Sequence, residues 1–170
     1  MSTVRPETVD GPVLVIGTGL IGTSIALSLR RSDVDVLLSD VDEENLRIAL
    51  QAEAGRLLTD GDAPALVVVA VPPRFAAEVL ARASADFPTA TLTDVTSVKS
   101  GVVSDALRLG ADPVRLVGGH PMAGRAVSGS AGARKELLDD RLWVVPPLTT
   151  SGSEHVERVR VLHRRHLEHD

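Results

Sequence analysis

The sequence contains no cysteine and no tyrosine, and only three of its 170 residues are aromatic. Without cysteine, disulfide bridges and thiolate metal sites are excluded. No stretch near the N-terminus resembles a signal peptide, so we expect a protein of the reducing cytoplasm. The longest apolar runs, such as residues 66–73, are far too short to span a bilayer, and we expect no membrane partner.

The chain also lacks an excess of positive charge, because 18 Lys and Arg residues face 23 Asp and Glu residues for a net charge of −5. This balance argues against nucleic acid as a partner, and the aromatic residues Phe75, Phe87 and Trp143 offer no platform for stacking bases. The length corresponds to one domain with a core of its own.

What is present is a regular alternation of short apolar runs and helical patterns. Residues 13–16 form a uniformly apolar run that is typical of a strand covered on both faces, and residues 20–31 carry the apolar stripe of a helix. The unit recurs with a strand at 34–39 and a helix at 43–54, after which Gly55 is expected to supply a left-handed helix end.

The alternation continues to the end of the chain. Further strands are expected at 66–71, 91–94, 116–118 and 142–145, and further helices at 76–85, 98–109 and beyond Ser151, which forms a capping box with Glu154. Strands that alternate with helices predict an α/β fold with a doubly wound parallel sheet. We divide the chain into a polar segment, 1–11, and a Rossmann-like dinucleotide-binding domain, 12–170, which ends within the helix after strand six.

The turn between the first strand and the first helix fits the pattern G-x-G-x-x-G. Gly17 permits the tight turn, Gly19 lets a pyrophosphate approach the backbone, and Gly22 lets the helix pack closely on the strand. Free N–H groups at the start of the helix would bind the anion. The cofactor-binding residues predicted here are Gly17, Thr18, Gly19, Leu20, Ile21 and Gly22.

Asp40 ends the second strand, 18 residues after Gly22, close to the spacing of an acid that binds the ribose of NAD. Its carboxylate would accept a hydrogen bond from the 2′-hydroxyl and repel a 2′-phosphate, so NAD is favoured over NADP. Arg47, the nearest downstream arginine, is expected to face solvent. The alternative is a glycine turn with an aspartate that merely caps a strand.

Three more strand ends carry candidate site residues, because the carboxyl ends of parallel strands form the ligand crevice of such a sheet. Val71, Pro72 and Pro73 follow the third strand, where they either line the dinucleotide or only end the strand. Ser97 and Lys99 follow the fourth strand and His120 follows the fifth. An imidazole there could take a proton from a hydroxyl group that Ser97 orients, whereas a loop-bracing His120 and a solvated Lys99 are the structural alternatives.

Four segments together carry a resemblance to a known family: G-T-G-L-I-G-T-S, A-V-P-P, D-V-T-S-V-K and G-G-H-P-M-A-G-x-x-x-S-G. They resemble the nucleotide-binding domain of the prephenate dehydrogenases of tyrosine biosynthesis, arogenate dehydrogenases included, over residues 13–147. The resemblance implies NAD-dependent oxidative decarboxylation of prephenate or arogenate. It also implies that His120 is the acceptor or base on the ring hydroxyl and that Ser97 is its partner near the nicotinamide.

Two departures from the family pattern bear on activity. Ala126 stands where family members often carry an acidic residue, and the helical domain that usually makes the dimer and supplies a substrate-binding arginine is absent. Two classes of function therefore remain. The first is a dehydrogenase whose substrate pocket is completed by a homodimer partner, another chain or a missing segment. The second is a truncated, non-catalytic NAD-binding module. A different small-substrate reductase is a third alternative, which the serine and histidine segments disfavour.

The last sixteen residues contain four of the five histidines: His155, His163, His166 and His169. Their spacing carries the imidazoles around the helix, and neighbouring arginines would repel a cation, so no metal site is predicted. We expect a solvated or fraying end in which Val156, Val159 and Leu162 pack on the sheet.

Overall fold

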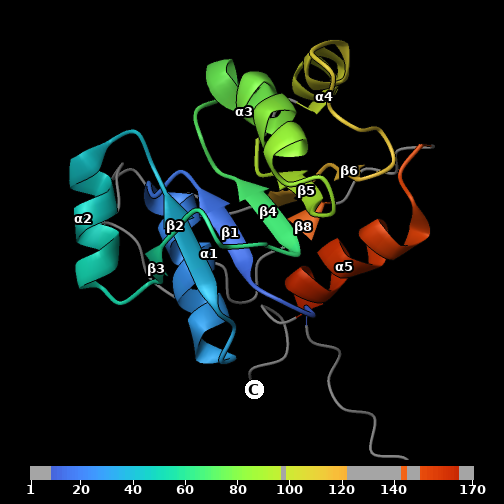
Figure 1. The fold of residues 1–170 in the computed structure, drawn as a ribbon. Coiled ribbons are helices and arrows are strands. Elements are labelled where there is room, and N and C mark those ends of the chain that lie inside the picture. Colours follow the sequence, from blue (N-terminus) through green and yellow to red (C-terminus); the bar gives the residue numbers. More distant parts are fainter. Residues whose placement is uncertain (1–8, 97–98, 122–142, 145–149, 165–170) are drawn as a thin grey trace, which may run out of the picture.

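The computed structural model describes residues 9–96, 99–121, 143–144 and 150–164. Its main feature is a six-stranded sheet in the order β3-β2-β1-β4-β5-β6, in which every pair of neighbours is parallel (Figure 1). The strands are β1 (Val13–Ile16), β2 (Val36–Ser39), β3 (Arg56–Leu57), β4 (Leu66–Val69), β5 (Thr91–Asp94) and β6 (Leu116–Val117).

Helices cover both faces of this sheet (Figure 1). On one face lie α1 (Leu20–Arg31), α2 (Glu43–Gln51) and α5 (Ser153–Arg164), and on the other α3 (Pro73–Asp86) and α4 (Lys99–Arg108). Strand residues alternate between the two cores, since Val13 and Val15 face the first set of helices and Leu14 faces the second. The predicted doubly wound α/β fold is confirmed.

The strand order reverses between β1 and β4, which places the crevice of the sheet at their carboxyl ends. Ile16 at the end of β1 is in register with Val69 at the end of β4. Just beyond these ends, the Ala70 N–H donates to the Ile16 carbonyl at 2.8 Å and the Gly17 N–H donates to the Ser39 carbonyl at 2.8 Å. The segments that follow β1, β2 and β4 are thereby held together at one edge.

The strands differ from expectation in two respects. The edge strand β3 was not expected. The strand expected at 142–145 is present as β8 (Trp143–Val144), but it lies outside the main sheet. It pairs antiparallel with β7 (His120–Pro121) in a two-stranded sheet of its own. A run of apolar residues indicates a strand but carries no information about its partner. The main sheet therefore has six strands as expected, but its sixth member is the edge strand β3 and not β8.

The expected role of Gly55 at the end of α2 was also wrong. Glu53 has the positive φ, 57°, and its N–H donates to the Leu50 carbonyl at 3.0 Å, as in a helix that ends on a left-handed residue. Gly55 is needed for a different reason, because a Cβ there would lie 2.6 Å from the carbonyl oxygen of Val36.

The predicted capping box at Ser151 and Glu154 is not formed. The Ser151 hydroxyl instead donates to the carbonyl of Leu116 at 2.6 Å, which ties the segment before α5 to the first residue of β6. The apolar face of α5 packs on the sheet as predicted, through Val156, Val159 and Leu162.

His155 is not part of a solvated end, which corrects the expectation for this residue. Only 6% of it is exposed, and its Nδ1 lies 2.7 Å from the Thr91 hydroxyl oxygen at the start of β5. The other three histidines of the tail provide no comparison, because the His163 side chain, His166 and His169 lie outside the described part of the chain.

Candidate nucleotide-binding site

The glycine turn joins β1 to α1 in a form that two of its glycines make possible. Gly17 has φ +99°, and a Cβ on it would lie 2.4 Å from the carbonyl oxygen of Ala70. A Cβ on Gly22 would lie 1.8 Å from the carbonyl oxygen of Gly17. Gly19 differs, because no atom lies within 4 Å of the place of its Cβ. The turn is therefore tightly packed at Gly17 and Gly22 and open at Gly19.

Helix α1 begins at this open position with its backbone donors uncapped by side chains. Gly19 is the N-cap residue, no side-chain cap hydrogen bond is formed, and no acid lies in the first turn of the helix. Leu20 and Ile21, which begin the helix, are half-buried. The N-terminus of a helix in this state carries partial positive charge and N–H groups that suit a phosphate.

Asp40 reaches the same turn from the end of β2. Its Oδ2 accepts hydrogen bonds from the Thr18 backbone N–H at 2.5 Å and from the Thr18 hydroxyl at 2.8 Å. Its Oδ1 accepts one from the Asp42 N–H at 2.8 Å. The carboxylate predicted to bind the ribose therefore lies beside the turn predicted to bind the pyrophosphate, although Thr18 and Asp40 are 22 residues apart in the chain.

Asp42 is a residue that our sequence analysis did not single out. It is the N-cap of α2, where its side chain accepts from the N–H groups of Glu44 at 3.0 Å and Asn45 at 2.9 Å. An aspartate immediately before a helical pattern is a recognisable cap signal, which could have identified it. Through its own N–H it couples the start of α2 to Asp40.

Arg47, expected to face solvent, does so. Its guanidinium group binds the Glu44 carboxylate at 2.6 Å and the Gln51 side-chain oxygen at 2.8 Å. The hydrogen bond from Arg47 lowers the pKa of the Glu44 carboxyl group. The arginine is thus engaged along the exposed face of α2.

The segment after β4 forms the neighbouring wall of the crevice. Val71 is half-buried, Pro72 is the N-cap of α3, and Pro73 is the first residue of that helix. The guanidinium of Arg74 lies 4.7 Å from the centre of the Phe75 ring, which is 47% exposed. From this segment, Ala70 and Val71 lie against Gly17 of the glycine turn.

The strand ends that carry the predicted catalytic residues are neighbours, because β5 and β6 pair in parallel. Asp94 ends β5 fully buried, and its Oδ2 accepts hydrogen bonds from the Thr96 N–H at 3.2 Å and from the Thr96 hydroxyl. Ser97 lies outside the described residues. The backbone of His120 begins β7, but its side chain is not described, so its meeting with Ser97 stays a prediction.

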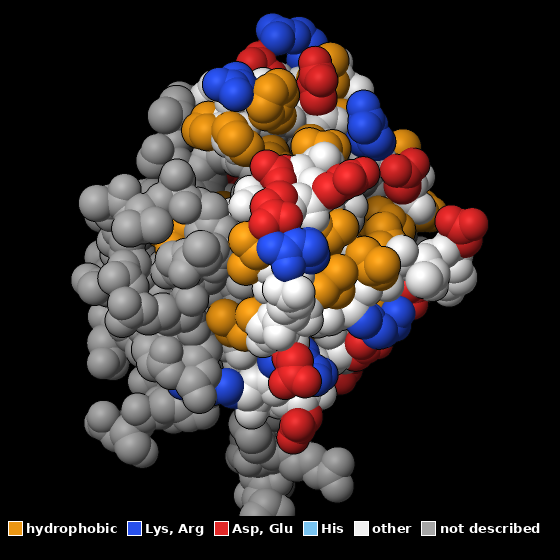
Figure 2. All heavy atoms as spheres, turned by 90° about the vertical axis from the view of Figure 1, so that its left-hand side faces the viewer, with side chains coloured by type: hydrophobic (Ala, Val, Ile, Leu, Met, Phe, Trp, Pro, Cys, Tyr) orange, Lys and Arg blue, Asp and Glu red, His pale blue; other side chains and the backbone are white. Residues whose placement is uncertain are grey.

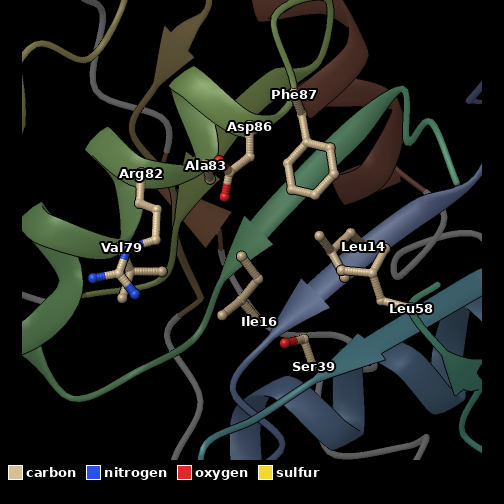
Figure 3. A pocket seen from close by; sticks show the side chains of 9 residues that line it. All are labelled: Leu14, Ile16, Ser39, Leu58, Val79, Arg82, Ala83, Asp86 and Phe87. Carbon is tan, nitrogen blue, oxygen red and sulfur yellow. The ribbon is translucent and has the colours of Figure 1, made fainter. Parts of the chain in front are cut away.

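A separate pocket of about 160 Å³ lies between α3 and the face of the sheet (Figure 3). Its floor comes from β1 and β2 and its opposite wall from the last turns of α3, where Arg82 and Asp86 supply the charged groups. Figure 2 shows the side of the molecule on which α2 and β3 lie, where apolar side chains reach the surface among charged ones. Ser39, the residue before Asp40, is one of the residues that line this pocket.

Over the described residues, no three histidine, cysteine or acidic side chains are grouped so as to hold a metal ion. No helix in the same part of the chain has the length and apolar character needed to cross a membrane.

A model of a known protein family matches most of the chain. The model described as "Prephenate dehydrogenase, nucleotide-binding domain" matches residues 25–166. The match begins after Gly22, so it does not depend on the glycine turn that many dinucleotide-binding proteins share.

Individual relatives agree with the family model. A probable prephenate dehydrogenase, NovF, from Streptomyces niveus is 39% identical over 85% of this chain and 40% of its own length, and a prephenate dehydrogenase from Lactococcus lactis is 33% identical over 93% and 48%. The chain thus spans less than half the length of these curated relatives.

Solved structures of prephenate and arogenate dehydrogenases are also similar to this chain. Prephenate dehydrogenase from A. aeolicus in complex with hydroxyphenyl propionate and NAD+ has a TM-score of 0.84 at 25% identity, covering 95% of this chain and 59% of that one. Arogenate dehydrogenase from Synechocystis has a TM-score of 0.80 at 26% identity, with coverages of 92% and 58%. The chain therefore belongs to the prephenate dehydrogenase family and carries its nucleotide-binding domain.

Proposed function

We propose that this chain is the NAD-binding part of a dehydrogenase that oxidatively decarboxylates prephenate or arogenate in tyrosine biosynthesis. The observation that carries the proposal is the glycine turn with Asp40 bound at its flank, in a chain of this family. A structural relative whose described complex contains NAD+ supports the choice of cofactor.

The residues present suit NAD better than NADP. Gly19 leaves the turn open where a pyrophosphate would approach, and the uncapped start of α1 offers N–H donors to it. Asp40 can accept from a ribose hydroxyl, whereas its negative charge opposes a 2′-phosphate. Arg47 is already engaged by Glu44 and Gln51, which makes it a poor partner for that phosphate.

In the proposed reaction, NAD when bound would supply the hydride acceptor for oxidation of the ring carbon that carries the hydroxyl group. We assign His120 as the acceptor of the hydroxyl proton and Ser97 as the residue that orients this group. The bond to the ring carboxylate then breaks, its electron pair makes the ring aromatic, and carbon dioxide leaves. The parallel pairing of β5 with β6, the strands that these residues follow, supports their convergence.

The domain division is part of the proposal. We take residues 12–170 as the dinucleotide-binding unit, with the addition of Val9, whose side chain is buried in the core. Because the curated relatives are more than twice as long, we infer that a further segment, a homodimer partner or another chain completes the substrate pocket. The absence of cysteine from the sequence supports a cytoplasmic location.

The same difference in length favours a second candidate, a nucleotide-binding module without turnover. The two candidates share NAD binding and differ only in catalysis. They are separated by measuring NADH formation when prephenate or arogenate is added to the chain at saturating NAD.

The cofactor assignment is tested by titrating NAD and NADP into the wild-type chain and the Asp40→Ala variant in a calorimeter. We expect the wild type to prefer NAD and the variant to lose about tenfold or more of that preference, since a hydrogen bond to a charged group is worth about 1.5–3 kcal/mol. An unchanged preference in Asp40→Ala would show the assignment to be wrong.

The catalytic assignment is tested with His120→Ala. Turnover should disappear while the affinity for NAD is retained, because His120 is assigned to the substrate hydroxyl rather than to the dinucleotide. If neither substrate is turned over by the wild type at high protein concentration, the chain is a binding module, and the catalytic part of the proposal fails.

A further inference from the structure

Thr18 is a buried polar residue whose donors are both directed at one oxygen atom. It is 0% exposed, and its backbone N–H and its hydroxyl each donate to Oδ2 of Asp40. A threonine in the second position of such a turn is not required by the backbone, because that position carries no glycine constraint. The side chain therefore has a role that the turn pattern alone does not explain.

Thr18 is itself held in place by a hydrogen bond from α1. Its carbonyl oxygen accepts a hydrogen bond of 2.9 Å from the hydroxyl of Thr23, which is 1% exposed and lies in α1. The N–H, the hydroxyl and the carbonyl of Thr18 are thus all engaged. Because these groups are buried and satisfied, the position of the Thr18 hydroxyl is fixed by the turn and by the helix.

Counting acceptor sites on Asp40 shows what remains for a ligand. A carboxylate has about four lone-pair sites, two on each oxygen. Thr18 occupies both sites of Oδ2, and the Asp42 N–H occupies one site of Oδ1. One site on Oδ1 remains for a further donor, and the half-buried side chain of Asp40 is accessible to solvent.

We propose that Thr18 is a positioning residue that fixes the Asp40 carboxylate, so that Oδ1 alone is presented to one ribose hydroxyl of the dinucleotide. This inference rests on the proposed function, which makes Asp40 the residue that distinguishes NAD from NADP. Without the Thr18 hydroxyl, only the Thr18 N–H would hold Oδ2 and only the Asp42 N–H would hold Oδ1, so the carboxylate could turn more easily about its terminal torsion, which is broad for aspartate. Selectivity for NAD over NADP then depends on Thr18 as well as on Asp40.

The test is the Thr18→Val variant, which keeps the branched shape and the backbone N–H and removes the hydroxyl. Affinities for NAD and NADP are measured by calorimetry. We expect the affinity for NAD to fall about tenfold and that for NADP to change much less, since one hydrogen bond to a charged group is lost. Thr18→Ser keeps the hydroxyl and is expected to stay within about twofold of the wild type.

A double-mutant cycle distinguishes positioning from a general effect on the turn. In the Asp40→Ala background, Thr18→Val should leave the affinity for NAD unchanged, because the carboxylate that it positions is gone. A further loss of affinity in that background would overturn the inference. Circular dichroism and thermal melts confirm that each variant is folded, and Thr18→Ala replaces Thr18→Val if the latter does not fold.

The outcomes separate the inference from the proposed function. If the wild type binds NAD selectively but Thr18→Val retains the full selectivity, the positioning role is wrong and the cofactor assignment stands. If the wild type binds neither NAD nor NADP, the cofactor assignment itself fails, and the positioning role fails with it.

Discussion

His155 belongs to a buried hydrogen-bond network at the start of β5. The Thr91 hydroxyl accepts a hydrogen bond of 2.6 Å from Arg158, and its oxygen lies 2.7 Å from Nδ1 of His155. The other ring nitrogen, Nε2, lies 3.3 Å from a carboxylate oxygen of Glu154. A positive charge on this ring would face the Arg158 guanidinium in a buried site.

Burial lowers the pKa of His155. Arg158 and Arg115 lower it further, while Glu154 and Asp112 act in the opposite direction. As the pH falls below the ordinary histidine value of about 6.5, the unfolded chain binds a proton before the folded chain does. This contribution to the free energy of unfolding is thus fully present above about pH 6.5 and is lost progressively as the pH falls toward the lower pKa of the folded state.

We predict that His155→Asn reduces this pH dependence. Asparagine offers an acceptor for the Thr91 hydroxyl but does not titrate, so the variant should lose less stability than the wild type between about pH 6.5 and 5. Urea unfolding at a series of pH values measures the difference. If the two proteins have the same slope of unfolding free energy against pH, His155 is not responsible for it.

At the same scale, the sequence predicted Asp40 as a site residue from its spacing to the glycine turn, but not its bonds to Thr18. Spacing along the chain places both residues at one edge of a parallel sheet, whereas a hydrogen bond depends on side-chain rotamers and burial. His155 was predicted incorrectly for a related reason. Its burial depends on where α5 lies relative to β5, and a helical pattern does not contain that information.

At the scale of elements, Arg115 joins the end of α3 to the start of β6. It is only 11% exposed, and its guanidinium binds the carbonyls of Ser84, Phe87 and Ala90 at 2.8–3.0 Å, together with Asp112 at 2.9 Å. A bond to the Ser84 hydroxyl at 2.9 Å uses the fifth donor. All five donors of the group are therefore engaged, in a geometry that a lysine cannot reproduce.

We predict that Arg115→Lys lowers the free energy of unfolding by about 2 kcal/mol, because the carbonyls at the end of α3 lose charged donors. Arg108→Lys is the matched control. Arg108 pairs with Asp105 on the surface, where its side chain is 76% exposed, and the change should cost less than about 0.5 kcal/mol. Urea denaturation of the three proteins measures both values, and equal effects at the two positions would contradict the role of Arg115.

The long, strongly patterned elements were predictable because burial on two faces leaves a clear trace in the sequence. Strands β1 and β4 are uniformly apolar, and α1 carries an apolar stripe. Strand β3 leaves no such trace, since both of its residues are exposed at the edge of the sheet. The expected strand at 142–145 formed, but its antiparallel partner β7 could not be inferred, because pairing is a tertiary property.

At the scale of the whole molecule, the chain carries the nucleotide-binding domain of its family and spans less than half the length of the curated relatives. The doubly wound sheet brings the turn, Asp40 and the segment after β4 together from three neighbouring strand ends, and the proposed function assigns these groups to the adenosine and pyrophosphate side of a dinucleotide. More than half of the length of each of the two curated relatives has no counterpart in this chain. We therefore expect cofactor binding and substrate binding to be separable in this chain.

The separation predicts unequal thermal shifts for the two ligands. A ligand that binds only the folded state at 100 times its Kd stabilises it by about 2.7 kcal/mol, and for a chain of this size each kcal/mol raises Tm by about 2–4 °C. NAD at that concentration should therefore raise Tm by about 5–10 °C, and NADP at the same concentration by less. Prephenate alone should leave Tm unchanged, because the residues of one half of its pocket are expected from a further segment or partner. A shift of several degrees with prephenate alone would show that this chain forms a substrate pocket by itself. If NAD and NADP give equal shifts in both the wild type and Asp40→Ala, Asp40 does not determine which cofactor is bound.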